Sequence, residues 1–352
     1  MKRFLAVLVV MVLSLAMVSS ALAADKIGVS MPTQSLQRWN QDGANMKEKL
    51  EAAGFEVDLQ YAGDNEVALQ VNQLENMIMS GCKVLVIAAI DGSALGTVLA
   101  DAKEAGIPVI AYDRLIMATD AVDYYATFDN YMVGTIQGKY VEEKLGLAEG
   151  KGPFNIEFVG GDPGDNNALY FFQGAVDVLK PYLDNGMLVC VSGQTSFEQV
   201  ATADWNTATA QDRFDQIITA NYATGTKLDA VLCSNDSTAM GVLNALANVG
   251  YEAGEYPVIT GQDCDKSNMP YVIDGRQSMS VFKDTRTLAG KVVEMVQAIM
   301  AGNAPEVNDT ETYDNGVKVV PSYLCAPVFG DASNYKELLI DSGYYTMADL
   351  GQ

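Results

Sequence analysis

Short apolar runs alternate with longer amphipathic segments along this chain, and this alternation constrains its fold more than any other feature. Val84–Ile90 is a nearly continuous apolar run, which is typical of a strand covered on both faces in a parallel sheet. The segment 67–78 instead repeats apolar residues at helical spacing. Two such series follow one another, so the sequence predicts an α/β protein with two doubly wound parallel-sheet lobes. The expected strands are 27–31, 55–61, 84–90, 109–112 and 124–128, then 154–159, 188–191, 228–233, 257–260 and 278–282.

Residues 1–23 have the pattern of a secretory signal peptide. Lys2 and Arg3 precede the apolar run 4–18, and Ala21-Leu22-Ala23 forms a small-residue cleavage site. A membrane anchor is the alternative, but the run is short for a span. No Cys lies near the cleavage site, which disfavours a lipoprotein anchor. We therefore predict export to the periplasm and a mature chain of 329 residues that begins at Ala24.

The mature chain is strongly acidic. It keeps 20 basic residues against 45 acidic ones, because two of the 22 basic residues lie in the predicted signal peptide. A net charge of −25 repels nucleic acid and anionic membrane surfaces. The sequence therefore predicts neither of them as a partner.

The chain contains no His, and this excludes several classes of enzyme. Ser-His-Asp hydrolases and His-ligated zinc enzymes both require that residue. Five Cys are scattered without C-x-x-C spacing, so we expect no metal or redox site, and whether any disulfide forms stays open. The glycine-rich segment 160–164 matches no phosphate-binding motif, and no calcium loop is present. We predict no cofactor.

The expected strands of both series end in side chains that can bind hydroxyl groups. Ligands of open α/β sheets lie beyond these carboxyl ends. Each residue could equally serve as a helix cap or a turn residue, and the Asp113-Arg114 pair could simply tie a loop. Their shared position favours a binding cleft for a small polar ligand. The residues concerned are Asp113 and Arg114, Asn166 and Asn167, Asn235 and Asp236, Asp263 and Lys283.

Both Trp residues lie in loops that lead from a strand to a helix. Arg38-Trp39 follows the first strand, and Trp205 precedes a helix of the second series. A pyranose has apolar C–H faces and a polar rim, which suits two aromatic planes ringed by hydrogen-bonding side chains. The alternative is that both Trp pack at helix starts.

Several segments together resemble the periplasmic sugar-binding proteins of ABC importers. Within that family the chain is most similar to the multiple-monosaccharide-binding receptors, near the xylose- and ribose-binding proteins. The similarity covers essentially the whole mature chain. The matching segments are VIAYDR at 109–114, YYATFDN at 124–130, GKGPFNIE at 150–157, DNNA at 165–168, GQD at 261–263, FKDTR at 282–286 and EVNDTETYDNGVKVVPSYL at 306–324.

The resemblance implies two Rossmann-like lobes joined by a three-segment hinge, with a sugar bound between them. The crossings are expected near 127–129, 282–284 and 313–320. The first lobe would then comprise 24–128 and 284–313, and the second 129–283 and 320–352. An inner-membrane ABC permease is the implied partner, a chemoreceptor or sensor kinase is a further possible one, and the receptor is expected to be a monomer.

The resemblance also implies roles for individual side chains. Trp39 and Trp205 would stack on opposite faces of the sugar, and the other side chains would bind its hydroxyls. Relatives often place Arg where this chain has Asn167, and Asn166 beside it could serve equally. The preferred aldose (xylose, arabinose, glucose or galactose) stays open. The predicted ligand-binding residues are Arg38, Trp39, Asp113, Arg114, Asn167, Trp205, Asn235, Asp263 and Lys283.

Two other functions remain alternatives to a sugar receptor. An exported glycoside-active enzyme could use carboxylates of the same cleft, such as Asp113 and Asp263. Each of these carboxylates has a nearby strong hydrogen-bond donor, Arg114 for Asp113 and Lys283 for Asp263. Such a donor suits binding of the ground state of a ligand. The sugar-sensing domain of a repressor shares the fold, but the signal peptide and the lack of a DNA-binding headpiece disfavour it.

Overall fold

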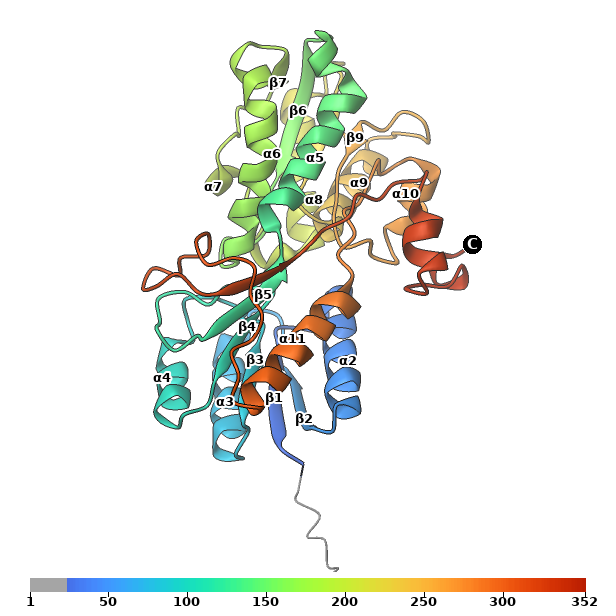
Figure 1. The fold of residues 1–352 in the computed structure, drawn as a ribbon. Coiled ribbons are helices and arrows are strands. Elements are labelled where there is room, and N and C mark those ends of the chain that lie inside the picture. The colour runs from blue at the N-terminus through green and yellow to red at the C-terminus, as the bar shows by residue number, and fades with distance from the viewer. Residues whose placement is uncertain (1–23) are drawn as a thin grey trace, which may run out of the picture.

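The computed structural model describes residues 24–352, so the predicted signal peptide lies outside the described residues. Two parallel sheets form the centres of two lobes, one above the other in Figure 1. Within residues 24–352, no helix is long and apolar enough to cross a membrane. The prediction of a two-lobed α/β fold is confirmed.

The sheet of the first lobe has six strands, and all its paired neighbours are parallel. In spatial order the strands are β10 (Ser322–Cys325), β5 (Tyr124–Phe128), β4 (Val109–Tyr112), β3 (Val84–Ile87), β1 (Lys26–Met31) and β2 (Glu56–Tyr61). The helices are α2 (Gln37–Ala52), α3 (Val67–Met79), α4 (Gly96–Glu104) and α11 (Thr285–Met300). The apolar sides of α2 and α11 pack on one face of the sheet through residues such as Met46, Leu50 and Leu288. The other face is covered by α3 and α4 through residues such as Leu74 and Leu99.

The second lobe repeats this arrangement around a parallel sheet of four strands. The strands are, in spatial order, β7 (Leu188–Cys190), β6 (Phe154–Val159), β8 (Ala230–Cys233) and β9 (Val258–Ile259). The helices are α5 (Asn130–Leu145), α6 (Asn166–Asp184), α7 (Phe197–Val200), α8 (Thr207–Asn221), α9 (Asp236–Asn248) and α10 (Met269–Asp274). Two helix pairs cover the faces of the sheet, α5 with α6 and α8 with α9. Short helical turns occur at Leu147–Glu149, Ala203–Trp205 and Ala348–Leu350, and a π-helical segment at Lys336–Asp341.

The chain passes between the two sheets three times. It leaves β5 for α5 at Asp129, whose carboxylate accepts a hydrogen bond from Met132 N and so caps that helix. It returns to the first lobe where Asp284 caps α11. The third passage follows β10, where Phe282 and Val328 form an isolated antiparallel bridge.

The predicted position of the third passage, at 313–320, is wrong. Residues 322–325 form β10, which pairs in parallel with β5 of the first sheet, so 320–325 do not belong to the second lobe. The strand is short, has no clear alternation of apolar and polar residues, and follows an irregular segment. Its place is fixed by backbone hydrogen bonds to β5, such as Asp129 N to Cys325 O at 2.9 Å, and these are not visible in the sequence.

The predicted strand 278–282 is also reduced in the structure. Val281 and Phe282 each form only an isolated bridge, to Gln262 and to Val328.

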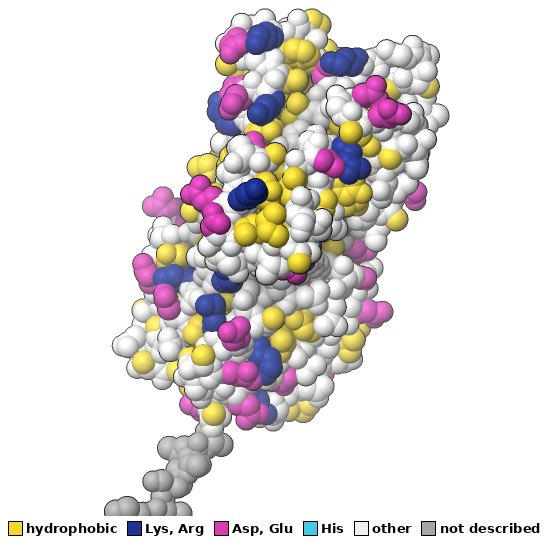
Figure 2. All heavy atoms as spheres, turned by 90° about the vertical axis from the view of Figure 1, so that its right-hand side faces the viewer, with side chains coloured by type: hydrophobic (Ala, Val, Ile, Leu, Met, Phe, Trp, Pro, Cys, Tyr) yellow, Lys and Arg dark blue, Asp and Glu magenta, His cyan; other side chains and the backbone are white. Residues whose placement is uncertain are grey.

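On the surface, acidic, basic and hydrophobic side chains are interspersed over the face shown in Figure 2, and no broad basic patch is visible there.

Candidate functional site

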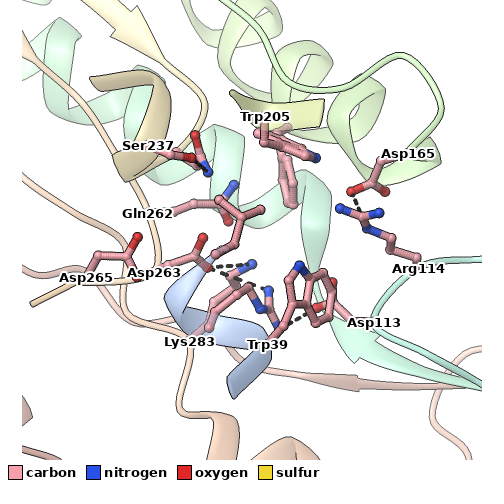
Figure 3. Close-up of a pocket in the computed structure, with 14 residues that line it drawn as sticks. Trp39, Asp113, Arg114, Asp165, Trp205, Ser237, Gln262, Asp263, Asp265 and Lys283 are labelled. Atoms are coloured by element: carbon pink, nitrogen blue, oxygen red, sulfur yellow. Dashed lines mark hydrogen bonds and ion pairs between the residues drawn. The ribbon is translucent and has the colours of Figure 1, made fainter. Parts of the chain in front are cut away.

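A cavity lies between the lobes, beyond the carboxyl ends of the strands of both sheets, and about 400 Å³ of space there, open solvent included, is free of protein atoms. Figure 3 shows the side chains that surround it. The lining residues are Leu36, Arg38, Trp39, Asp113 and Arg114 from the first lobe, and Asp165, Phe171, Trp205, Asn235, Ser237, Gln262, Asp263, Asp265 and Lys283 from the remainder of the chain.

A chain of alternating charges crosses one wall of the cavity. Arg38, at the start of α2, lies with Nη2 2.9 Å from Asp113 Oδ1 and with Nη1 3.6 Å from Asp263 Oδ1. Lys283 Nζ lies 3.0 Å from the same Asp263 oxygen. Arg38 also donates a hydrogen bond from Nε to Asp42 at 2.9 Å. All these side chains are buried, so the opposite charges compensate one another where water is scarce.

Arg114 forms a second charged connection between the lobes. Its Nε lies 3.1 Å from Oδ2 of Asp165, which precedes α6 in the second lobe. Its Nη1 donates to the carbonyl oxygens of Ala89 and Ile90 at 3.0 and 3.2 Å, which fixes the guanidinium on the first lobe. Arg114 is thus held by one lobe and ion-paired with the other.

The two indoles lie on opposite sides of the cavity in Figure 3. Trp39 is 2% exposed, and the guanidinium carbons of Arg38 and Arg114 lie 4.7 and 5.0 Å from the centre of its ring. Such cation–π contacts stabilise an arginine beside an aromatic face. Trp205 meets Phe171 edge to face, with 6.1 Å between the ring centres. Both aromatic planes are therefore fixed by their neighbours.

Three of the lining residues have a left-handed backbone, which is uncommon for residues other than glycine. The φ angles are 59° at Asp113, 55° at Trp205 and 91° at Asp263. Asp113 is held in this conformation because its N–H donates to Ala126 O at 2.7 Å and its carbonyl oxygen accepts from Tyr125 Oη at 2.6 Å. Such strain is concentrated at functional sites, where the surrounding structure enforces it.

The carboxyl groups of the site differ in their affinity for protons. Burial opposes ionisation of Asp113, but the charges of Arg38, Lys283 and Arg114 outweigh it and hold the pKa of this carboxyl below its ordinary value. Burial and the charge of Asp263 raise the pKa of Asp265 to about 7. Asp113 is therefore a charged acceptor of hydrogen bonds at neutral pH, whereas Asp265 is close to its titration midpoint.

Several buried polar atoms of the cavity wall have no hydrogen-bond partner within residues 24–352. Three of them also take part in no ion pair: Trp39 Nε1, which is a donor, and Gln262 Oε1 and Asp265 Oδ1, which can accept. Buried polar groups normally have partners. The wall therefore offers both donors and acceptors to a ligand that carries many hydroxyl groups.

Eight of the nine predicted binding residues line the cavity. Asn235 does so while its Oδ1 also caps α9 by accepting from Thr238 N at 3.0 Å, so the cap and the cavity interpretation both apply to it. Contact of these eight residues with a ligand stays a prediction.

Asn167 is the exception and does not line the cavity. Its Oδ1 accepts from Asn130 Nδ2 at 3.0 Å and lies 2.9 Å from Tyr125 Oη, and its Nδ2 donates to Asp113 O. All its side-chain polar atoms are thus engaged in holding α6 against the first lobe. The prediction that Asn167 faces the ligand is not supported by its position.

Other lining residues are not among the predicted ligand contacts. Asp165 lies within the DNNA segment, and the structure pairs it with Arg114. Gln262 and Asp265 lie on either side of Asp263, and the spacing around the GQD segment could have indicated both. Phe171 lies one helical turn after Asn167, and Ser237 in the first turn of α9, and neither carries a signal in the sequence.

Neither a metal site nor a disulfide is found in the described part of the chain. No group of His, Cys, Asp and Glu side chains within 24–352 could hold a metal ion. All five Cys are free, and four of them are buried. The disulfide that the sequence left open is therefore not formed in this structure.

Several known proteins are similar to this chain over nearly its whole length. Residues 27–304 match the periplasmic binding protein domain family. The chain is 51% identical to the multiple sugar-binding periplasmic receptor ChvE of Rhizobium radiobacter, with 93% of each chain covered. It is 36% identical to the D-xylose-binding periplasmic protein of Escherichia coli, with 92% of each covered. An ABC transporter solute-binding protein from Clostridium phytofermentans, solved with bound β-D-glucose, is 66% identical with a TM-score of 0.90, covering 93% of this chain and 100% of that one. The chain therefore belongs to the periplasmic binding protein family, in its branch of multiple sugar-binding receptors.

Proposed function

We propose that this chain is an exported receptor that captures a neutral monosaccharide between its lobes and delivers it to an ABC permease. The observation that carries the proposal is the cavity with Trp39 and Trp205 on opposite sides and a polar rim of alternating charges. The glucose bound to the relative from Clostridium phytofermentans supports the same ligand class.

The charges around the cavity favour a neutral ligand. Arg38, Arg114 and Lys283 are each close to a carboxylate, in Asp113, Asp165 or Asp263. A negatively charged ligand would therefore find no unpaired cation among these three groups. Sugar hydroxyls can instead donate to these carboxylates and accept from the cationic groups without disturbing the balance. Specificity follows because a sugar that lacks one hydroxyl leaves a buried polar group unpaired.

The proposed mechanism is lobe closure without a chemical step. A sugar that contacts both lobes stabilises a closed state that the chain can already reach. The closed molecule then presents surfaces of both lobes to the permease, and a chemoreceptor or sensor kinase would use the same signal. The cycle takes place in the periplasm, after export directed by residues 1–23.

Calorimetry with D-xylose, L-arabinose, D-glucose and D-galactose tests the proposal, combined with product analysis of the same solutions. We expect saturable binding of at least one aldose and no new product. A chain that binds none of the four, or that releases a reducing sugar from a glycoside, would contradict it.

A further inference from the structure

The C-terminal tail makes hydrogen bonds to the helix that carries two of the cavity residues. Tyr345 Oη accepts from Gln37 Nε2 at 2.6 Å and from Gln41 Nε2 at 3.0 Å. Both glutamines belong to α2 and lie one helical turn apart on the same face. Arg38 and Trp39 follow Gln37 directly, so the tail holds the helix at its ligand-binding end.

The ring of Tyr345 is packed on the second lobe, so these bonds join the two lobes. It belongs to a hydrophobic cluster with Cys264, Met269 and Leu339 and is 4% exposed. Figure 1 shows the C-terminal end of the chain beside α10 of the second lobe. The hydroxyl at the tip of the ring is the part that reaches α2.

Gln37 makes a second contact between the lobes. Its Oε1 accepts a hydrogen bond from Lys266 N at 3.0 Å. Lys266 lies three residues after Asp263, which pairs with Arg38. The Lys266 side chain also lies 5.2 Å above the Tyr345 ring and pairs with Asp349 at 2.6 Å. One glutamine of the first lobe is thus held by a loop and by the tail of the second.

None of these groups lines the cavity. Gln37, Gln41, Lys266 and Tyr345 are absent from its wall, although Arg38, Asp263 and Asp265 are part of it. Their contacts can therefore change the stability of the closed arrangement without touching the ligand. Removal of such a contact therefore weakens closure without removing a contact to the ligand.

We propose that Tyr345 is a positioning residue for ligand capture: through Gln37 and Gln41 it latches α2 to the second lobe and so strengthens sugar binding from outside the cavity. The latch rests on the proposed function, because it acts on lobe closure around a sugar. It closes when the lobes meet and opens when they separate, so its hydrogen bonds add to the affinity for every ligand that both lobes enclose.

Tyr345→Phe tests the latch, because it removes the hydroxyl and keeps the ring in its cluster. We expect the dissociation constant for D-glucose, or for whichever of the four aldoses the parent binds, to rise about fivefold to tenfold. The rise should come from faster dissociation. The urea midpoint of the sugar-free protein should stay unchanged, which a merely structural role would not allow.

Gln37→Leu removes the partner of Tyr345 on α2. It is a second test of the latch in case Tyr345→Phe does not fold. It should weaken binding at least as much, because the bond from Lys266 N is lost as well, and the double variant should lose less affinity than the sum of the two single losses, because the bond between Tyr345 and Gln37 is shared. Tyr182→Phe is the matched control, because its hydroxyl bonds Glu142 within the second lobe at 2.7 Å.

Three results would overturn the latch. An unchanged dissociation constant in Tyr345→Phe would mean that these bonds do not depend on closure. An equal loss in Tyr182→Phe would mean that any lost hydroxyl weakens binding. If the parent binds none of the aldoses, the proposed function fails and the latch fails with it, whereas sugar binding that is unaffected by Tyr345→Phe removes the latch alone.

Discussion

The indole of Trp205 lies directly over Gly161, where a Cβ atom would come within 2.0 Å of the ring. The backbone of β6 runs into this glycine, and the ring reaches the cavity only because no side chain stands in its way. The position of the Trp205 ring in the cavity wall thus requires glycine at position 161.

Gly161→Ala is predicted to weaken sugar binding at least tenfold. The ring of Trp205 must shift, because its atoms are rigid and Phe171 packs against it. Titration followed by Trp fluorescence measures the effect. Gly290→Ala is the control: it lies in α11 with open space around its Cβ position, so binding should not change. Equal affinity of Gly161→Ala and the parent would contradict the placement of the ring.

Trp205→Ala is predicted to abolish or greatly weaken binding while the fold survives. The substitution removes one of the two aromatic faces of the cavity. Calorimetry with the preferred aldose gives the loss in affinity, and circular dichroism checks the fold. A loss smaller than about 0.5 kcal/mol would rule out stacking on this indole.

Asp165→Asn is predicted to raise the dissociation constant at least tenfold. The change keeps an oxygen that caps α6 but removes the charge that pairs with Arg114 across the lobes. A buried cation without its partner is costly, so the closed state loses stability. Asp184→Asn serves as control, because its ion pair with Lys180 is exposed and lies within one helix. Similar affinities in both variants would show that the Arg114 pair does not contribute to closure.

The pH dependence of stability is predicted to change in Asp265→Asn. Burial and the charge of Asp263 raise the pKa of Asp265 to about 7 in the folded chain, above its ordinary value of 3.8. Between these pH values the carboxyl of Asp265 has lost its proton in the unfolded chain but keeps it in the folded chain. The contribution of this carboxyl to the free energy of unfolding therefore falls as pH rises from about 4 to 7.

Urea unfolding of the sugar-free protein at pH 4.5 and pH 8 measures this effect. The free energy of unfolding of Asp265→Asn relative to the parent should be higher at pH 8 than at pH 4.5, by roughly 1 kcal/mol or more. A difference that is the same at both pH values would show that Asp265 titrates normally.

The sequence predicted most of the fold because the relevant signals are local. Apolar runs such as Val84–Ile90 and the helical spacing of 67–78 depend only on neighbouring residues, and both elements are present as β3 and α3. β10 was missed because a short edge strand owes its position to hydrogen bonds with β5 and carries little pattern of its own.

The sequence also predicted most of the residues that line the cavity, because polar residues follow the expected strands. Strand ends of a parallel sheet meet at one edge, so the order of strands and helices places Asp113 at that edge of the first lobe and Asp263 at that edge of the second, and the packing of the lobes brings the two edges together. Asn167 shows where this reasoning stops. It has the right position in the chain, but its amide is turned to Tyr125 and Asn130, while Asp165 two residues earlier faces Arg114.

The sequence by itself determined the two lobes, the order of most elements and the edge at which polar side chains collect. The tertiary structure decided which of those side chains face the cavity and which tie the lobes together. The reason is physical: periodicity fixes a backbone element, whereas the direction of a side chain at its end depends on left-handed angles such as those of Asp113 and Asp263. It depends also on partners such as Arg38 with Asp263, which only the folded chain brings together.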